Sequence, residues 1–277
     1  MAAVIARVLM RAAPTPGPEA VATARSAPWS RATGAAQQLL PAVLALGRLS
    51  EHLVRSGICE SDSAGQWPPE RPMVTGAAGL IHRRCRTTPV GTQAPDDRTQ
   101  EPGVGVAEIG LRRTARGGWE LLQGVVVVRD AGPAWPAGAR VTHDLARRTP
   151  PTASPFRTGP HPPDAGTDSV PRDADTPGSL TLTAADVRAW ADATGDHNPI
   201  HLQPGAAHRA GLAAGEQELV AHGLLLGALS LALAPTTGVV DLRFPVPAAL
   251  SVDGVARLGV LPAGSLTIAG RTVLVRR

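Results

Sequence analysis

A short segment near residue 200 gathers side chains that could move protons. Its residues are Gly195, Asp196, His197, Asn198, Pro199, Ile200 and His201. Pro199 prevents a continuous helix here and disfavours helical geometry at the residue before it. A turn can therefore fold the Asp196 carboxylate and the His201 imidazole toward a common point. Such a pair can take a proton from a shared water and deliver one to a neighbouring carbon near neutral pH, which is general acid–base catalysis.

A second group of residues could stabilise the charge that such a reaction creates. Adding water across an α,β-unsaturated carbonyl requires a hydrogen-bond donor for the oxygen that becomes negative. Ala221, His222 and Gly223 stand downstream, where an apolar helix is expected to begin. The first amides of a helix are unpaired and lie at the positive end of its dipole. Gly223 would also let a thioester carbonyl approach closely, because it has no side chain.

Both groups have a plain structural alternative. Asp196 could only cap the backbone amides of a turn, and the residues alone do not decide between this role and catalysis. We expect His222 to cap the helix or pack at its start, with contact to substrate as the alternative. His197 and His201 are four residues apart, an interval found in metal sites, but Pro199 and the lack of nearby Cys or Glu argue against zinc. We therefore predict no metal site.

Two helices are expected to hold these residues in place. Thr183 is a suitable N-cap, with Asp186 three residues further on to complete a capping box. A helix over residues 183–194 should then end at Gly195. A second helix should cover about residues 222–234. It is apolar on every side, which indicates that it is buried on every side.

The C-terminal part of the chain predicts an antiparallel sheet. Strand-like stretches follow the apolar helix at residues 239–246, 249–261 and 265–275. A fully buried helix followed by antiparallel strands indicates a sheet wrapped around that helix, so the expected fold class is α+β. Few residues follow Ala234, and a sheet this short could leave the helix partly uncovered.

The proton-moving segment resembles a known family. Thr194 to Leu202, with Ala221-His222-Gly223 downstream at a helix start, is similar to the MaoC-like dehydratases, also called (R)-specific enoyl-CoA hydratases. The resemblance spans residues 179–246. It implies a hot-dog fold, in which an antiparallel sheet wraps around a central apolar helix. It also implies interconversion of trans-2-enoyl and (R)-3-hydroxyacyl thioesters of coenzyme A or acyl carrier protein, without a metal or other cofactor.

The resemblance also assigns roles to individual residues. It implies that Asp196 and His201 are the catalytic pair. The Gly223 amide, with His222 beside it, would bind the thioester oxygen. The loop that carries the catalytic pair would be shaped by Gly195, Asn198 and Pro199.

Composition divides the chain into three parts. Proline is frequent in residues 146–178, and such a segment buries too little apolar surface to fold by itself. We expect a linker there, between an N-terminal half at residues 1–145 and a C-terminal hot-dog domain at residues 179–277. Part of residues 1–72 is expected to be poorly ordered, although residues 35–54 have helical apolar spacing.

The N-terminal half is expected to be a divergent hot-dog unit. The sequence from Gly79 to Arg86 looks like the start of a degraded copy, although no second G-D-x-N-P-x-H string occurs there. Turns are expected at residues 112–118 and 130–138. They should separate the antiparallel strands 104–111, 119–129 and 139–145. We therefore expect two hot-dog halves in one chain, the first shaping the acyl pocket and the second supplying catalysis.

Composition also excludes several kinds of chemistry. All 27 basic residues are arginine, so no lysine can form a Schiff base or serve a phosphate loop, and no tyrosine can act as an acid. The arginines are scattered and the net charge is +4, so we expect no nucleic-acid binding. Cys59 and Cys85 fit a reduced, cytoplasmic protein. The longest strongly apolar stretch, residues 220–235, is shorter than the ~20 residues of a membrane helix, so we expect no membrane association.

The sequence thus predicts a hydratase or dehydratase that acts on an acyl-CoA or acyl carrier protein thioester. The alternative is a non-catalytic hot-dog subunit that binds acyl thioesters or braces a catalytic partner. A thioesterase on the same fold is a weaker third hypothesis. The pair of Asp196 and His201 favours the enzyme, because a scaffold needs neither. A homodimer and a hetero-oligomer with another hot-dog chain both fit this prediction.

Overall fold

The computed structural model describes residues 1–12, 21, 23, 26–58, 80–91, 106–129, 131–148 and 179–277. In the N-terminal half the described elements are α1 (Ala2–Met10), α3 (Pro28–Arg55), β1 (Ile81–Pro89), β2 (Val106–Arg116), β3 (Trp119–Val128) and β4 (Ala139–Arg148).

The C-terminal half contains short helices and a second set of strands. Its first elements are β5 (Ser179–Thr183), α4 (Ala184–Thr194), α5 (Pro199–Leu202), α6 (Ala206–Arg209), β6 (Glu218–Val220) and α7 (Gly223–Leu233). They are followed by β7 (Val240–Arg243), β8 (Ala249–Ser251), β9 (Val255–Val260), the short 3-10 turn η2 (Pro262–Gly264), β10 (Leu266–Ile268) and β11 (Arg271–Arg276).

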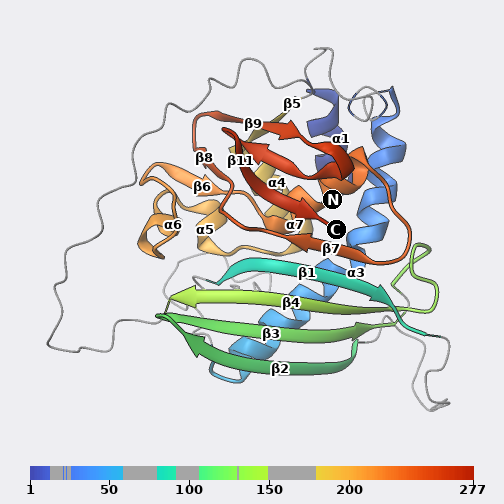
Figure 1. Cartoon of the computed structure of the whole chain (residues 1–277), viewed down its shortest axis with the longest axis vertical. Helices are drawn as coiled ribbons and strands as arrows, with labels where there is room; N and C mark the ends of the chain where they lie inside the picture. Colours follow the sequence, from blue (N-terminus) through green and yellow to red (C-terminus); the bar gives the residue numbers. More distant parts are fainter. Residues whose placement is uncertain are drawn as a thin grey trace, which may run out of the picture.

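Strands from both halves form one antiparallel sheet. Among the described residues its order is β2-β3-β4-β1-β7-β11-β10-β9-β5, while β6 and β8 pair separately. Figure 1 shows this sheet curving around α3 and α7, which pack against each other. The fold class is therefore α+β, as the sequence predicts, with an antiparallel sheet wrapped around central helices.

The two halves repeat one plan and meet at equivalent strands. In each half the strand that follows the central helix lies at the junction, and β1 pairs with β7 there, with Cys85 opposite Leu242. The later strands continue outward on each side. Only the C-terminal half has a described strand before its central helix at the far edge, which is β5. This arrangement is that of two hot-dog halves, with the first one strand shorter in the described part.

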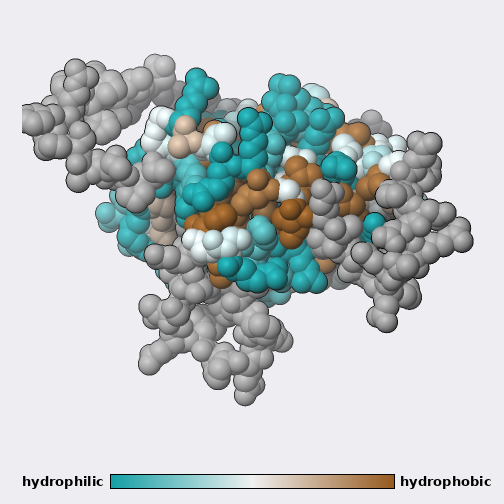
Figure 2. Space-filling model, turned by 90° about the horizontal axis from the view of Figure 1, so that it is seen from below, coloured by the Kyte–Doolittle hydropathy of each residue, from teal (hydrophilic) through white to brown (hydrophobic). Residues whose placement is uncertain are grey.

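Within the described residues, the edge of the first half's sheet at β2 is less covered than the edge at β5. β2 has a described neighbour only in β3, and its Ile109 and Leu111 are only partly buried against the core. Figure 2 looks at the molecule from this side and shows a band of hydrophobic residues between hydrophilic ones. Ordered packing of the first half thus depends on the buried face of α3.

The helix α3 confirms and extends the predicted helix at residues 35–54. It begins at Pro28, which suits the first turn because that position needs no amide hydrogen bond. Its buried residues recur every three or four positions and include Leu39, Leu49 and Leu53. α1 and α3 both lie within residues 1–72, where we expected poor order in part.

The apolar helix α7 is buried along its length. Every residue from Leu224 to Leu233 is buried. α7 contacts β11 on one side and α3 and α1 on the other, so the N-terminal half supplies cover that the short C-terminal sheet does not. The concern that this helix might be uncovered is therefore not borne out.

One predicted turn and the strand before it differ from the structure. The turn predicted at residues 112–118 is wrong, because β2 runs to Arg116 and the turn is only Gly117 and Gly118. Both glycines have positive φ, +59° and +74°, which suits a tight hairpin whose twist matches the strands. The arginines near the end of β2, which are Arg112, Arg113 and Arg116, resemble a polar turn in composition, but they are exposed residues of a continuous strand.

Of the three predicted C-terminal strands, the first corresponds to β7 and the other two are each divided in two. The stretch 249–261 bends at a turn near Gly254 and forms β8 and β9, which join different sheets. The stretch 265–275 folds back at Ala269 and Gly270, both at positive φ, and forms the hairpin of β10 and β11. The predicted linker, residues 146–178, overlaps the last three residues of β4, and residues 149–178 lie outside the described part.

No helix of the described part is long and apolar enough to cross a membrane.

Candidate active site

The loop that carries Asp196 follows directly from the end of α4. Thr183 and Asp186 form the predicted capping box at the start of this helix. Gly195 ends it in the left-handed region, with φ of +74°, and its amide donates to the Ala191 carbonyl at 2.7 Å. Asp196 is therefore the first residue beyond the helix. Its side chain is 26% exposed, and its Oδ1 accepts from the Asn198 amide at 3.4 Å.

Asn198 anchors this loop to the N-terminal half. Its Oδ1 accepts from the Ile200 amide at 3.3 Å, so it caps α5, and Pro199 occupies the first helical position. Its Nδ2 donates to the Leu80 carbonyl at 2.8 Å, just before β1. The single asparagine of the chain thus connects the two halves at the candidate site.

His201 is buried and held in one tautomer. Its Nδ1 lies 2.6 Å from the Val220 carbonyl oxygen, which can only accept, so Nδ1 carries the hydrogen. Nε2 is therefore left as an acceptor when the ring is neutral. One ligand-type atom each of Asp196, His201 and His222 lies within 4.8 Å of the others. The structure thus brings the predicted pair together.

His222 supports both members of this pair. Its ring stacks on that of His201 with the centroids 3.8 Å apart. Its Nε2 donates to the backbone carbonyl of Asp196 at 3.0 Å and lies 4.0 Å from that residue's Oδ2. The expected side-chain cap on α7 is not formed, because the ring turns toward the Asp196 loop instead. Its buried Nδ1 has no hydrogen-bond partner in the part of the chain that the structure describes.

Gly223 is the first residue of α7 and faces the site. It lines the two cavities that also contain His201. A side chain here would meet the Phe244 ring, since a Cβ atom would lie 3.0 Å from it. The Phe244 ring thus packs against Gly223, whose amide is at the first position of α7, where a helix has no internal partner for it.

Electrostatics keep the carboxylate charged and the imidazoles neutral. Burial by itself would raise the pKa of Asp196, but the nearby His222 and His201 rings and the Asn198 amide reverse this and hold the pKa below its ordinary value. Burial lowers the pKa of His201, against the opposing effect of Asp196. Burial also lowers the pKa of His222 to about 3. At neutral pH the site therefore holds one carboxylate and two neutral rings.

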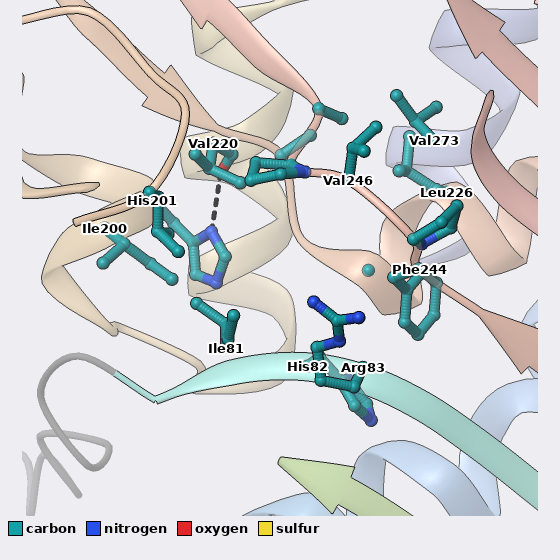
Figure 3. A pocket seen from close by; sticks show the side chains of 16 residues that line it. Ile81, His82, Arg83, Ile200, His201, Val220, Leu226, Phe244, Val246 and Val273 are labelled. Atoms are coloured by element: carbon teal, nitrogen blue, oxygen red, sulfur yellow. Dashed lines mark hydrogen bonds between the residues drawn. The ribbon is translucent and has the colours of Figure 1, made fainter. Parts of the chain in front are cut away.

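Two small cavities meet at His201 and Gly223. The outer one has a volume of about 50 Å³ and is lined by Ile81, Arg83 and Val246 among others. Figure 3 shows Ile81 and Arg83 on one side of β1 and His82 on the other. The inner cavity, of about 40 Å³, also contains Asp196, Asn198 and Leu224. His201 thus lines both cavities, whereas Asp196 lines only the inner one.

The N-terminal half supplies lining residues that sequence reasoning did not assign. From α3 it contributes Leu46 and Ser50 to the inner cavity, and from β1 it contributes His82 to both. His82 is bonded to His143, with Nε2 and Nδ1 2.8 Å apart, and His143 Nε2 donates to the Ala42 carbonyl at 3.1 Å. No local motif marks these residues, because their roles depend on the packing of one half against the other.

Two residue groups have the ligand types of a metal site. One is Asp196, His201 and His222, and the other is His82, Cys85 and His143, each with atoms within 4.8 Å. In the first group two ring nitrogens already donate to carbonyls. In the second, burial raises the pKa of the Cys85 thiol to about 12, whereas zinc binds the thiolate. The donor chemistry favours hydrogen bonding, and the absence of a metal stays a prediction.

The fold and the site together define a hot-dog protein with a carboxylate and an imidazole at the junction of its two halves. Residues 167–255 match the family model described as MaoC like domain, so the chain carries a MaoC-like domain over these residues. No curated protein sequence matches the chain.

Several solved structures resemble the chain at low sequence identity. HtdX from Mycobacterium tuberculosis is 20% identical, with a match over 99% of this chain and 93% of that one and a TM-score of 0.45. Full-length peroxisomal multifunctional enzyme type 2 from Drosophila melanogaster is 15% identical over 84% and 39%, with a TM-score of 0.40. A MaoC-like dehydratase from Phytophthora capsici is 13% identical over 78% and 72%, with a TM-score of 0.36.

Proposed function

We propose that this protein adds water to trans-2-enoyl thioesters, or removes it from (R)-3-hydroxyacyl thioesters. The observation that carries the proposal is the arrangement of Asp196, His201 and Gly223, which lie together where the outer and inner cavities meet. The match to the MaoC-like domain supports the same class of reaction. Neither a metal nor another cofactor is needed for it.

The protonation states suit the activation of one water. A water between the two side chains donates one hydrogen to the Asp196 carboxylate and the other to His201 Nε2, which is free because Nδ1 bonds to Val220. As the water oxygen bonds to C3 of the enoyl group, its proton passes to Nε2. The same proton then goes to C2, so that the elements of one water are added. Dehydration is the reverse sequence.

The start of α7 stabilises the charge that develops on the thioester oxygen. Attack at C3 turns the thioester into an enolate, whose oxygen needs a donor. The amide of Gly223 is at the positive end of the helix, and Gly223 has no side chain of its own to shield it. A charge-assisted hydrogen bond here favours the transition state over the ground state.

The two cavities determine the orientation of the bound substrate. The inner cavity is lined by apolar groups such as Leu46, Leu145 and Leu224, which suit the acyl chain. The outer cavity opens beside Arg83 and suits the carrier arm of the thioester. The first half thereby shapes the acyl pocket, while the second supplies the acid–base pair.

The direct test is the loss of enoyl-thioester absorbance when crotonyl-CoA is added. The wild-type protein should remove the band, and Asp196→Asn should reduce kcat by about 10²–10⁴-fold, the range for a lost general acid or base. Asp192→Asn is the matched control, because Asp192 lies on α4 with its side chain 78% exposed. If the wild type leaves both crotonyl-CoA and a longer enoyl-CoA unchanged, or if Asp196→Asn keeps full activity, the proposal is wrong.

The structure does not support one of the reasons for a non-catalytic hot-dog subunit, which is an uncovered α7. It would be favoured if the short C-terminal sheet left α7 uncovered, but Leu224 to Leu233 are buried. We therefore carry only the catalytic proposal forward.

A further inference from the structure

A large groove lies on the outer face of the first half's sheet, away from α3. Its volume is about 620 Å³, much more than that of either cavity at the catalytic pair. The strand register places Thr114, Leu121 and Ala146 side by side on this face. Leu121 is 40% exposed, whereas its neighbours Glu120 and Leu122 are buried on the other face. The groove therefore crosses β2, β3 and β4 and ends at β1.

The charges around this groove are not balanced within the protein. Arg83, Arg112 and Arg116 line it, and none of the three has an ion-pair partner among the described residues. The lining includes one carboxylate, Asp144, which already accepts from Gln123 at 2.9 Å.

Some other arginines of the same sheet are paired, whereas Arg86 and Arg140 have no ion-pair partner among the described residues. Arg84 binds Asp241 through two nitrogens, at 2.9 and 2.6 Å. Arg113 and Arg147 both bind Glu120. Arg83, Arg112 and Arg116 thus bring three guanidinium groups without ion pairs to one groove, and together they favour a ligand with more than one negative charge.

An aromatic side chain lies among these arginines. Trp119, at the start of β3, lines the groove, and the guanidinium of Arg148 lies 5.4 Å from the centre of its ring. Trp119 and Leu121 together give the groove an apolar floor. A flat ring system that carries phosphates fits this combination, because its ring can pack on Trp119 while guanidinium groups bind the phosphates.

The groove is continuous with the candidate active site through one residue. Arg83 lines both the groove and the outer cavity that contains His201. Figure 3 shows its guanidinium group among the residues of that cavity. Neighbouring strands are ~4.8 Å apart, so the groove extends about 14 Å from β1 across β4 and β3 to β2. An extended chain with two amide groups, such as the pantetheine arm of coenzyme A, is long enough to span it.

We propose that this groove binds the adenosine 3′,5′-bisphosphate end of coenzyme A while the thioester lies at His201. The substrate is then a coenzyme A ester and not an acyl carrier protein ester. Arg112 and Arg116 bind the phosphates, Trp119 supports the adenine, and Arg83 lies beside the arm between the two ends. This inference rests on the proposed function for the position of the thioester, but the binding of the nucleotide does not depend on turnover.

The first experiment measures binding alone by calorimetry. Adenosine 3′,5′-bisphosphate is titrated into the full-length wild type, into the double variant Arg112→Ala/Arg116→Ala, and into Arg257→Ala. Arg257 is the matched control, since it is an exposed arginine on β9, in the other half of the sheet. The wild type and the control should bind equally, and the double variant should bind at least about tenfold more weakly, the loss expected from charge-assisted contacts. Equal thermal midpoints would show that all three are folded.

Two results of this titration overturn the proposal. One is a wild type that does not bind the bisphosphate, and the other is a double variant that binds as tightly as the wild type. Either result leaves the hydration reaction untouched. Conversely, normal bisphosphate binding without any turnover of crotonyl-CoA would sink the proposed function and leave the nucleotide site in place.

The second experiment separates the two kinds of carrier. It compares kcat/KM for crotonyl-CoA with kcat/KM for the crotonyl ester of N-acetylcysteamine, which lacks the nucleotide. The ratio of the two should fall about tenfold in the double variant and stay constant in Arg257→Ala. If a crotonyl-acyl carrier protein loses as much kcat/KM from the double substitution as crotonyl-CoA does, the groove serves a protein surface and the assignment to coenzyme A is wrong.

Discussion

The imidazole rings of His201 and His222 stack with their centroids 3.8 Å apart, and each ring donates to the backbone of a different segment. His201 donates to Val220 and His222 donates to Asp196. The stack therefore fixes the Asp196 loop, the end of β6 and the start of α7 relative to one another. A histidine outside the acid–base pair thus positions both of its members.

Replacing His222 should slow catalysis without removing the pair. His222→Phe keeps a ring beside His201 but loses the hydrogen bond to the Asp196 carbonyl, and leaving a buried acceptor unpaired costs about 1–3 kcal/mol. We expect kcat for crotonyl-CoA to fall about tenfold or more, with a smaller change in KM. His208→Phe, at an exposed position on α6, is the control. An unchanged kcat in His222→Phe would remove this positioning role.

Stability should fall as the solution becomes mildly acidic. Burial lowers the pKa of His143 to about 4 and that of His222 to about 3, both below the ordinary 6.5. A folded state with the lower pKa binds fewer protons than the unfolded chain, so the stabilisation is complete above pH 6.5 and is lost as the pH falls below it. Each such histidine contributes up to about 1.4 kcal/mol per pH unit in that window. Carboxylates with lowered pKa, such as Asp196, lose their contribution only at more acidic pH.

Urea unfolding between about pH 7 and pH 5 measures this effect. The free energy of unfolding should decrease over this range, and His143→Gln should make the decrease smaller. His208→Gln should leave the slope as in the wild type, because His208 is exposed. A free energy that is constant from pH 7 to pH 5 would show that the buried histidines do not control acid stability.

A side chain at Gly223 should have two separable effects. In Gly223→Ala the new Cβ lies 3.0 Å from the Phe244 ring, and overpacking of this kind costs about 1–3 kcal/mol of stability. Gly223→Ala/Phe244→Leu should recover stability by making room. Activity should not recover to the same extent, because the methyl group still stands in front of the amide that binds the thioester oxygen. Full recovery of kcat/KM in the double variant would argue against that role.

The control for these two variants is Gly34→Ala. Gly34 lies on an exposed part of α3, and no atom lies within 4 Å of the Cβ that the substitution adds. It should leave activity unchanged and raise stability by up to about 1 kcal/mol, the difference in helix propensity between glycine and alanine. Chemical denaturation and crotonyl-CoA turnover on the same samples separate the two effects.

Asp186 should contribute strongly to stability because it connects three elements. It is fully buried and accepts from the Thr183 amide at 3.0 Å, from the Thr183 hydroxyl at 2.7 Å and from Arg7 of α1 at 3.0 Å. Arg11 binds it as well. Asp186→Asn removes the charge that two arginines share, and we expect a loss of about 2–4 kcal/mol in the free energy of unfolding.

Denaturant unfolding tests this prediction, with Asp192→Asn on the exposed face of the same helix as its control. Proteolysis near α1 should also become faster in Asp186→Asn, because α1 loses its ionic contact with α4. Equal unfolding free energies for the two variants would mean that the capping box and the arginines contribute little.

The local features around the candidate site could be predicted from the amino-acid sequence. The capping box of Thr183 and Asp186, the helix end at Gly195 and the turn at Pro199 each depend on hydrogen bonds or sterics between residues a few positions apart. The continuous apolar character of α7 likewise predicted its burial. The pattern and spacing of residues were therefore sufficient to propose Asp196 and His201 as a candidate pair.

Tertiary structure alone decided which distant residues meet. Asn198 bonds to Leu80, His222 stacks on His201, and Arg83 joins the cavity to the outer groove. The N-terminal half also covers α7 where the C-terminal sheet is short. These contacts follow from how the two halves of one sheet join at β1 and β7 and how α3 and α7 pack against that sheet. Such packing depends on the whole set of buried surfaces, and no short sequence pattern encodes it.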